Sequence, residues 1–367
     1  MPKHLFLIVT AIATVAAIVC RFAGVPPLVV FALSCLSILG LAGLLGESTE
    51  ELGAYLGHRV GGILNATVGN VGEIIICVFA LRAGLVDLVK ASITGSIIGN
   101  LLLVCGASLV VGGAKHGIQR FDARAAGMNA VQLVLATVGL VVPAVFAFLV
   151  GGEQIAANFL PIESVTLGVA ALLLVLYGLS IWYDQTRPLE ATVRSGDEVH
   201  ATGHVTTPGG WRPALVKLLI ASGFLAWVSE ILVGSIEPVI AQLGITEFFL
   251  GLILIPVIGN LAEHLVAVQL AAKNRMDFSI AVSLGSATQI ALFAAPVLCF
   301  LSIPLGHPLT LVFTPFEVIA IGLGSIVAAL IAIDGESNWL EGAQLIAVYL
   351  ILAVAAFFLP VAAGGGH

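Results

Sequence analysis

Two stretches of the chain repeat each other without a gap: GNVGEIIICVFALRAGLVDLVKASITGSIIGNLLLV at residues 69–104 and GNLAEHLVAVQLAAKNRMDFSIAVSLGSATQIALF at residues 259–293. An offset of 190 residues aligns Glu73 with Glu263 and also aligns several other polar residues. Apolar residues match by chance in an apolar chain, whereas uncommon polar residues at fixed spacing do not. The sequence therefore predicts an internal duplication. The further aligned pairs are Gly69 and Gly259, Asn70 and Asn260, Asp87 and Asp277, Gly95-Ser96 and Gly285-Ser286, and Glu47 and Glu237.

The composition around these stretches places the chain in a lipid bilayer. Of 367 residues, 59% are hydrophobic and only 10% are charged, with a mean hydropathy of +1.13, whereas soluble domains are about 25% charged. The net charge of −7 comes without a basic run, so we expect no nucleic-acid partner. Neither an HExxH motif nor paired aspartates at membrane depth occurs, so we expect a transporter without a cofactor and not an enzyme.

Apolar runs of about 20 residues predict an all-α integral membrane protein with eleven transmembrane helices. Residues 3–20 also fit a signal peptide, but no small-residue cleavage motif precedes Arg21, which favours a retained helix. The expected spans are 5–21, 26–46, 60–82, 86–112, 122–149, 157–182, 213–242, 245–272, 278–303, 310–333 and 339–361.

The offset carries the second to sixth spans onto the seventh to eleventh and leaves the first span as an extra helix. Because five is odd, the two copies must cross the membrane in opposite senses, which is the inverted-repeat plan of secondary transporters. The expected parts are an extra N-terminal helix (1–22), a first five-helix repeat (23–182), a connecting loop (183–212) and a second five-helix repeat (213–367).

Lys and Arg lie mostly at one end of the expected spans, with eleven of the 14 on the side of the N-terminus. The positive-inside rule then predicts a cytoplasmic N-terminus, a cytoplasmic connecting loop and an extracellular C-terminus. The eleven are Lys3, Arg59, Lys115, Arg120, Arg124, Arg187, Arg194, Arg212, Lys217, Lys273 and Arg275, and the other three are Arg21, Arg82 and Lys90.

The two aligned glutamates lie at the expected centre of the bilayer. Glu73 stands about ten residues before the turn at 82–87 and Ser96 about ten residues after it, which at about 1.5 Å per residue puts both about 15 Å deep. The repeat gives Glu263 and Ser286 the same depth from the other face. A charge there costs at least about 2.5–3.5 kcal/mol, so we expect both glutamates to be functional.

Oxygen donors cluster around both glutamates in the sequence. Gly and Asn residues weaken each helix just before its glutamate, and unwound backbone there would free carbonyl oxygens. Carboxylates, amides and hydroxyls suit Ca²⁺, which takes about six to eight oxygens, better than Zn²⁺, because His264 is the single adjacent imidazole. The amides and hydroxyls could equally cap or cross-link helices. The candidate cation ligands are Glu73, Glu263, Asn70, Asn260, Ser96, Ser286, Asn100 and Gln289.

Protons are expected to compete for the same carboxyl groups. Burial and mutual repulsion favour protonated carboxyls in an empty site, whereas a divalent cation favours carboxylates. His264 is a candidate proton relay or a satisfied buried histidine, and Asp87 and Asp277 are expected to cap helices. Three glutamates near span ends are either ordinary solvated carboxylates or the lining of a cation entry path: Glu47, Glu230 and Glu237.

The two quoted stretches closely resemble the signature repeats of the cation/proton exchanger (Ca²⁺/H⁺ antiporter) family in the cation/Ca²⁺ antiporter superfamily. The resemblance implies Ca²⁺/H⁺ antiport, with Glu73 and Glu263 as central cation ligands and proton acceptors and with two gating helices moving against a core. No long regulatory tail of the eukaryotic vacuolar kind precedes the first span, so the chain resembles prokaryotic members and the plasma membrane is expected.

The expected function is therefore export of Ca²⁺ from the cytoplasm in exchange for protons by alternating access, with Ca²⁺, H⁺ and membrane lipid as partners. Na⁺-coupled Ca²⁺ exchange and a passive cation channel are the alternatives. The repeats lack the Pro-Glu pairing and extra carboxylates typical of Na⁺-coupled relatives, which disfavours the first alternative. The sequence is compatible with a homo-oligomer.

Overall fold

The computed structural model describes residues 3–151, 159–186 and 211–359, which are almost entirely helical. In hydrocarbon every backbone N–H and C=O must be paired inside its own segment, and apolar runs of this length satisfy that condition as helices. Residues 187–210 of the expected connecting loop lie outside the described residues. The helices are α1 (Lys3–Phe22), α2 (Pro27–Leu56), α3 (His58–Val68), α4 (Val71–Arg82), α5 (Val86–Ile98), α6 (Cys105–His116), α7 (Ala123–Gly151), α8 (Phe159–Thr186), α10 (Trp211–Val233), α11 (Ile236–Leu243), α12 (Glu247–Phe249), α13 (Ile255–Ala272), α14 (Met276–Gln289), α15 (Ala295–Ser302), α16 (Pro315–Asp334) and α17 (Trp339–Phe358), with π-helical segments η1 (Gly99–Val104), η4 (Leu250–Leu254) and η5 (Ile290–Ala294) and strands β1 (Gln119–Arg120) and β2 (Glu336–Ser337).

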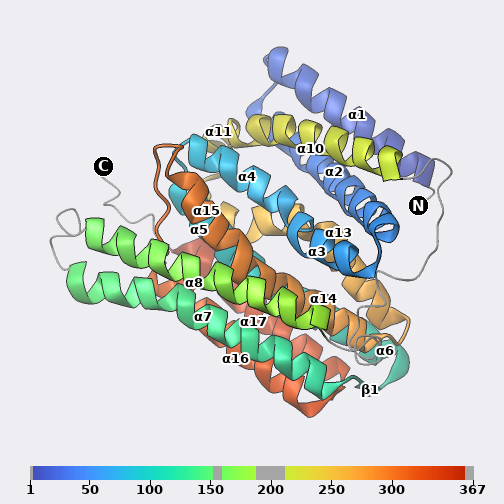
Figure 1. Cartoon of the computed structure of the whole chain (residues 1–367). Coiled ribbons are helices and arrows are strands. Elements are labelled where there is room, and N and C mark those ends of the chain that lie inside the picture. Colours follow the sequence, from blue (N-terminus) through green and yellow to red (C-terminus); the bar gives the residue numbers. More distant parts are fainter. Residues whose placement is uncertain (1–2, 152–158, 187–210, 360–367) are drawn as a thin grey trace.

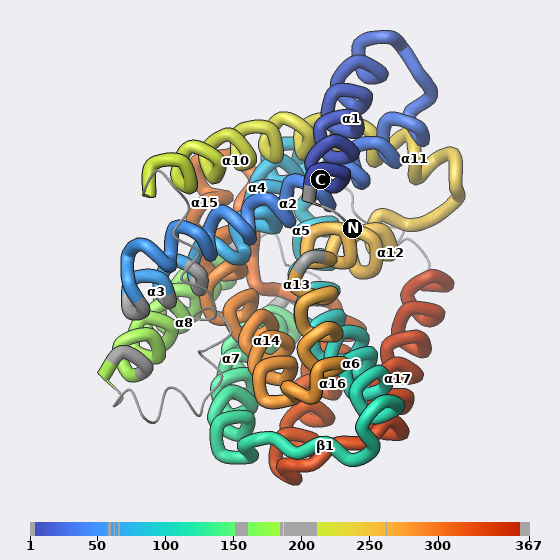
Figure 2. The backbone as a smooth tube through the Cα atoms, turned by 90° about the vertical axis from the view of Figure 1, so that its right-hand side faces the viewer, coloured from blue at the N-terminus to red at the C-terminus, as the bar shows by residue number. Residues whose placement is uncertain are grey.

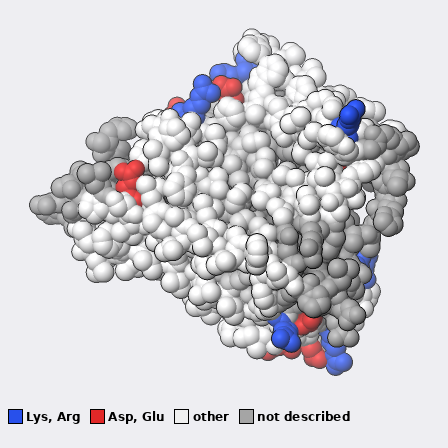
Figure 3. All heavy atoms as spheres, in the orientation of Figure 1, with Lys and Arg blue, Asp and Glu red and all other residues white. Residues whose placement is uncertain are grey.

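The protein is a multi-pass, all-α membrane protein. Within the described ranges, nine helices are long and apolar enough to cross a membrane, and a tenth span results if α11 and the helix that begins at Glu247, bent by 113°, count together. The expected span 60–82 is absent from that set because the chain leaves the helix at Gly69 and Asn70, between α3 and α4. The expected count of eleven therefore stays a prediction. Figure 3 shows one broad face that is mostly uncharged, with Lys, Arg, Asp and Glu gathered near its margins.

The helices form a buried centre flanked by two outer groups (Figure 1). On one side α2 packs against α1, α3 and α10, and on the other α16 packs against α7. Between them, α13 contacts α4, α5, α6 and α14. The central helices are the most enclosed, with 72% of the most apolar window of 86–116 buried and 67% of that of 276–302, against 22% for α1. Residues of these central helices are therefore placed to form a site shielded from lipid.

Contacts near the ends of the helices mark the two faces of the molecule. We call the face where α1 begins the N-terminal face and the face where α1 ends the distal face. On the N-terminal face β1 pairs antiparallel with β2, Gln119 opposite Ser337 and Arg120 opposite Glu336, and Figure 2 shows β1 at the edge of the molecule between α6 and α7. On the distal face Glu247 Oε1 accepts a hydrogen bond of 3.1 Å from the backbone N–H of Leu88.

The duplication is visible in the secondary structure of the centre. Helices α5 and α14 begin 190 residues apart, and so do α6 and α15. In each copy a π-helical segment, η1 or η5, joins the two helices. Such segments widen a helix locally and occur frequently at functional sites.

Side-chain caps differ from those expected. The helix N-termini at Leu85 and Arg275 carry no side-chain cap, so the capping role expected for Asp87 and Asp277 is wrong. Instead Asp277 Oδ1 accepts from the backbone N–H of Asp122, 2.5 Å away, because the start of α14 lies against the segment that leads into α7. Sequence spacing can predict that an aspartate lies in the first turn of a helix, but it cannot predict which neighbouring segment contacts its carboxylate.

A capping box with a buried glutamate begins α16. Thr314 is its N-cap, and Glu317, only 1% exposed, accepts from both the backbone N–H and the hydroxyl of Thr314 at 2.8 Å. Thr94 of α5 donates a third hydrogen bond to Glu317 at 3.2 Å. Glu317 therefore connects α16 to the central helix α5.

Candidate cation-binding site

Four helices bring the predicted site residues together. Glu73 stands in the first turn of α4, directly after the break at Gly69 and Asn70, and Glu263 lies within α13. Ser96 lies near the end of α5, and Ser286 occupies the corresponding place in α14. Each serine donates to the glutamate of its own copy: Ser96 Oγ to Glu73 Oε1, and Ser286 Oγ to Glu263 Oε2 at 2.7 Å. The duplication has therefore produced two similar carboxyl–hydroxyl pairs.

Residues from one copy also contact those of the other. Asn260 of α13 donates from Nδ2 to Glu73 Oε1 and lies 3.4 Å from Ser96 Oγ. Asn100 of η1 donates to the carbonyl oxygen of Ser96 at 3.0 Å and to the hydroxyl of Ser286 at 3.3 Å. The two glutamates are thereby joined by one hydrogen-bond network that contains residues of both repeats. The structure thus confirms that these residues converge.

Asn70 and Gln289 form a further contact between the repeats. Asn70, whose side chain is 1% exposed, donates from Nδ2 to Gln289 Oε1 at 2.8 Å. Gln289 is the last residue of α14, immediately before η5. Although Asn100 and Gln289 are one residue out of repeat register, both therefore reach the other copy.

Two buried oxygens of the group accept no hydrogen bond from any described residue: Glu73 Oε2 and Asn70 Oδ1. Buried oxygens without a donor are uncommon in folded proteins, because leaving one unpaired costs about 1–3 kcal/mol. Both atoms belong to the residues on either side of Val71 and Gly72 at the start of α4. Both also belong to residues predicted from the sequence as cation ligands.

Glu73 packs closely against a glycine of the other repeat. A Cβ atom placed on Gly259 would lie 3.3 Å from Glu73 Cγ, which is tighter than most real contacts. A larger residue at 259 would push against the glutamate itself. This gives the Gly-Asn pair of the second copy a steric role besides the hydrogen bond of Asn260.

The two copies differ in their backbone, contrary to the expectation of unwound backbone before both glutamates. The first copy leaves the helix at Gly69 and Asn70, whereas α13 runs without a break through Gly259 and Asn260. In the second copy the irregularity lies earlier, in the π-helical segment η4 and in the turn at Gly234 and Ser235. A repeat in sequence allows either conformation, and the packing around each copy decides which one forms.

The copies also differ in how closely their helices approach. A Cβ on Gly95 of α5 would lie 2.0 Å from the carbonyl oxygen of Leu252 in η4, so the two backbones touch. No described atom lies within 4 Å of the same position on Gly285, its counterpart in α14. Instead α3, the counterpart of η4, packs its Gly61 against Gly53 of α2. Among the described residues, this backbone contact therefore forms at Gly95 and has no equivalent at Gly285.

Sequence alignment had paired Gly95 with Gly285 but had given neither glycine a role. The signal was present, since both sit immediately before the site serines and glycine lowers helix stability in a helix interior. Only the structure shows that one of them contacts a backbone and the other does not.

The remaining candidate residues lie outside the network. His264 is buried next to Glu263, and no described residue forms a hydrogen bond with its Nε2. Glu230 and Glu237 are exposed near the distal face, at the end of α10 and the start of α11. Glu47 is half-buried in the part of α2 near the N-terminal face. A proton relay at His264 and an entry path along these glutamates stay predictions.

Comparison with known proteins identifies the family. The model of the family described as sodium/calcium exchanger protein matches residues 26–184 and 214–358, most of the chain. The chain belongs to the sodium/calcium exchanger family. This membership confirms the resemblance to the cation/proton exchangers of the same superfamily.

Relatives of this exchanger are similar over nearly their whole length. A Ca²⁺/H⁺ antiporter of Aphanothece halophytica is 39% identical over 347 residues, which cover 90% of this chain and 91% of the relative. The Ca²⁺/H⁺ antiporter ChaA of Bacillus subtilis (strain 168) is 37% identical over 365 residues, 97% of this chain and 100% of the relative. The solved structure of native YfkE matches with a TM-score of 0.82 and 35% identity over 96% of this chain and 100% of that chain. These matches confirm the all-α membrane fold.

Proposed function

We propose that the protein is a secondary antiporter that exports Ca²⁺ from the cytoplasm in exchange for protons, with Glu73 and Glu263 binding the cation or protons in turn. The observation that carries the proposal is the hydrogen-bond network that joins the two glutamates across the repeats. The relatives named above as Ca²⁺/H⁺ antiporters support the choice of ions. As a transporter, the protein releases its substrates chemically unchanged.

The proposed cation ligands are oxygens that the network brings to one place. Glu73 Oε2 and Asn70 Oδ1 are buried and accept no hydrogen bond from a described residue, and Glu263 lies next to the Ser286 hydroxyl. Carboxylate, amide and hydroxyl oxygens are the donors that a hard cation such as Ca²⁺ prefers. Asn260 and Asn100 act in this proposal as positioning residues, because their amide nitrogens orient Glu73, Ser96 and Ser286.

Exchange follows from competition for the two carboxyl groups. When Ca²⁺ is bound, both glutamates are carboxylates and their charge balances the cation. When Ca²⁺ leaves, two like charges held close together, one of them on the buried Glu73, repel each other and are costly to keep, so protons replace the cation. The empty site with two negative charges is thereby disfavoured, so the protein does not change between its two access states without Ca²⁺ or protons bound.

Access to the site alternates between the faces by movement of the irregular helices. In this structure Gly95 and Leu252 bring α5 and η4 into backbone contact on the distal side, while the counterpart Gly285 has no such neighbour. In this proposal the site is closed on the distal side and exchanges ions with the N-terminal face. The other state would exchange these roles, with α3 approaching α14 and η4 withdrawing from α5, as inverted repeats permit.

The N-terminal face is proposed to be cytoplasmic and the membrane to be the plasma membrane. Eleven of the 14 Lys and Arg residues lie on that side of the expected spans, as the positive-inside rule requires of cytoplasmic segments. The observed conformation would then be the one that collects Ca²⁺ from the cytoplasm.

The test is Ca²⁺ flux in proteoliposomes under an imposed pH gradient, with and without Na⁺. The intact chain is expected to move Ca²⁺ against the proton flux, and Glu73→Gln and Glu263→Gln are each expected to abolish it. Glu341→Gln is the matched control, because Glu341 sits in the capping box of α17 and takes no part in the network. Unchanged proton-driven flux in either site variant would refute the mechanism. Flux that follows a Na⁺ gradient would establish the Na⁺-coupled alternative, and Ca²⁺ movement without proton counterflow would indicate a channel.

A further inference from the structure

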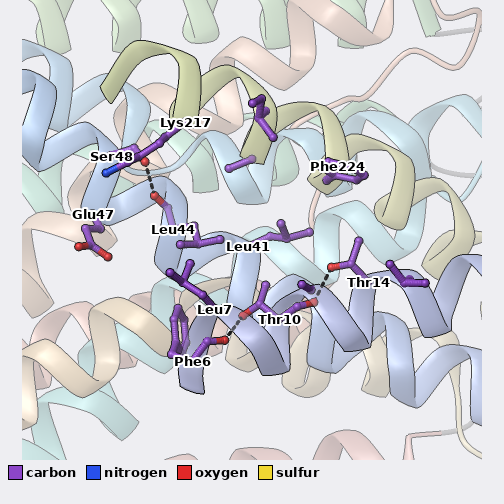
Figure 4. Close-up of a pocket in the computed structure, with 14 residues that line it drawn as sticks. Phe6, Leu7, Thr10, Thr14, Leu41, Leu44, Glu47, Ser48, Lys217 and Phe224 are labelled. Carbon is purple, nitrogen blue, oxygen red and sulfur yellow. Dashed lines mark hydrogen bonds between the residues drawn. The ribbon is translucent and has the colours of Figure 1, made fainter. Parts of the chain in front are cut away.

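A large groove lies between α1, α2 and α10, away from the two glutamates (Figure 4). Its volume is about 650 Å³, within the range of sites that hold small molecules. These helices belong to an outer group of the bundle, so the groove lies against the lipid-facing side of the protein. The lining residues are Phe6, Leu7, Thr10, Ala11, Thr14 and Val15 of α1, Leu41, Leu44, Glu47 and Ser48 of α2, and Lys217, Ile220, Ala221 and Phe224 of α10.

The body of the groove presents almost no polar group to an occupant. Its hydroxyls are satisfied by their own helices or by a neighbour: Thr10 Oγ1 donates to the Phe6 carbonyl at 2.9 Å, and Thr14 Oγ1 lies 2.6 Å from Ser37 Oγ. Ser48 Oγ donates to the Leu44 carbonyl at 2.7 Å. Water in such a groove would find few partners, whereas a hydrocarbon chain needs none.

The length of the groove corresponds to one leaflet. Along α1 it extends from Phe6 to Val15, nine steps along the helix that rise about 14 Å at ~1.5 Å each. The hydrocarbon core of a bilayer is about 30 Å thick, so about 14 Å is half of it. Because α1 begins at Lys3, the groove starts near the N-terminal face and ends near the bilayer centre.

Charges of both signs mark only the end of the groove at the N-terminal face. Lys217 and Glu47 line the groove there (Figure 4), and Lys217 Nζ lies 3.0 Å from Glu51 Oε2, one turn further along α2. The Lys217 side chain is still 55% exposed, so its ammonium group can take a further partner. An apolar groove one leaflet long with a cation and carboxylates at its mouth matches an amphiphile with a zwitterionic head.

We propose that this groove binds one phospholipid with an ethanolamine headgroup from the leaflet at the N-terminal face. One of its two acyl chains fills the space between α1 and α10, its phosphate meets the Lys217 ammonium, and its own ammonium faces the carboxylates of Glu47 and Glu51. A choline headgroup is less suited because its methylated nitrogen cannot donate hydrogen bonds to carboxylates. A glycerol headgroup offers no positive charge to them at all.

The lipid would bind to three helices that already pack together. Helix α1 is attached to α2 by the Thr14–Ser37 hydrogen bond and by the close approach of Thr10 to Gly40, while α10 packs along the other side of α2. The bound acyl chain would fill the gap that these three helices leave and keep them together as one unit. The inference itself rests on the groove alone and does not depend on which ions are exchanged.

The test measures bound lipid on the full-length purified chain by native mass spectrometry. Detergent-solubilised protein is mixed in turn with phosphatidylethanolamine, phosphatidylcholine and phosphatidylglycerol of identical acyl chains. One molecule of phosphatidylethanolamine per chain is expected to stay bound, with affinity at least about tenfold higher than that of the other two lipids, a difference of about 1.4 kcal/mol.

Paired variants separate the groove from the rest of the surface. Ala11→Trp fills the groove from an exposed position on α1, and its neighbour Ile12, 63% exposed and not part of the lining, supplies the control Ile12→Trp. Lys217→Gln removes the phosphate partner, and Arg212→Gln on the same helix removes a cation outside the groove. Ala11→Trp and Lys217→Gln are each expected to lower ethanolamine-lipid binding by at least about tenfold, and both controls to leave it unchanged.

Retention of the lipid in Ala11→Trp, with a melting temperature equal to that of the intact chain, would overturn the proposal. Loss in both tryptophan variants alike would also overturn it, since binding would then not be confined to the groove. Equal binding of the three lipids would overturn the assignment of the headgroup.

Discussion

Replacing Gly95 by alanine should shift the protein out of the conformation described here. The new Cβ would lie 2.0 Å from the carbonyl oxygen of Leu252 and 2.7 Å from the ring of Pro256, whereas ordinary contact begins at 3.4 Å. Because the nearest atoms are backbone and not the end of a flexible side chain, η4 would have to withdraw from α5 by about 1.4 Å, from 2.0 to 3.4 Å.

The cost of that contact sets the size of the effect. Overpacking a well-packed interior costs about 1–3 kcal/mol. Because the atoms that must move here belong to the backbone, we expect a cost near the upper end of that range. About 3 kcal/mol shifts the ratio of the two access states by roughly 100-fold toward the state open at the distal face. Exchange needs both states, so the Ca²⁺ flux should fall by up to about two orders of magnitude.

Hydrogen exchange measured by mass spectrometry would report the state directly. In Gly95→Ala the amides of η4 and of the second half of α5 should exchange faster than in the intact chain. Gly285→Ala is the matched control because no described atom lies within 4 Å of its Cβ position. It should leave that protection unchanged or increase it, while still slowing the flux by hindering the opposite state. Wild-type flux together with wild-type exchange in Gly95→Ala would refute the reasoning.

Three further substitutions test separate parts of the structure. Asn100→Leu removes the two hydrogen bonds by which Asn100 connects Ser96 to Ser286. At about 1 kcal/mol or more for each bond, proton-driven Ca²⁺ flux should fall by about 10- to 100-fold. Circular dichroism should show that the helices stay intact. Glu317→Ala removes the acceptor of three hydrogen bonds, one of them from the buried Thr94, and should lower the free energy of unfolding by about 2 kcal/mol, seen as a lower melting temperature. An unchanged melting temperature would contradict the role given to this capping box. Thr14→Val breaks the buried hydrogen bond to Ser37 and should weaken the packing of α1 on α2 by about 0.6–1.7 kcal/mol. Limited proteolysis should therefore release α1 faster than in the control Val15→Thr, which changes an exposed residue.

Residue type and spacing were sufficient to locate the centre of the site. Glu73 and Glu263 could be placed at mid-membrane because helices rise by a constant amount per residue and hydrocarbon has a fixed thickness. The serines and asparagines followed from the 190-residue offset, and the structure joins them in one network. The exact pairing was not available, because whether Asn260 donates to Glu73 or only caps a helix depends on the orientation of two helices that are distant in sequence.

The differences between the repeats could not be predicted from the sequence. Gly95 and Gly285 are equivalent in the alignment, yet only Gly95 touches a backbone. The break at Gly69 and Asn70 has no equivalent at Gly259. A duplicated sequence encodes the same local preferences twice, and an exchanger requires that the two copies be able to adopt different arrangements.

By itself, then, the sequence determined that the chain is a helical membrane protein, that it is duplicated, and that two carboxyl groups lie where charge is costly. These features depend on composition, periodicity and depth, which are local or additive along the chain. Only the tertiary structure decided which hydrogen bonds join Glu73 to Glu263, that Gly95 and not Gly285 meets a backbone, and that α1, α2 and α10 leave a groove one leaflet long. Those features depend on how helices far apart in sequence pack together, and packing is a property of the whole bundle.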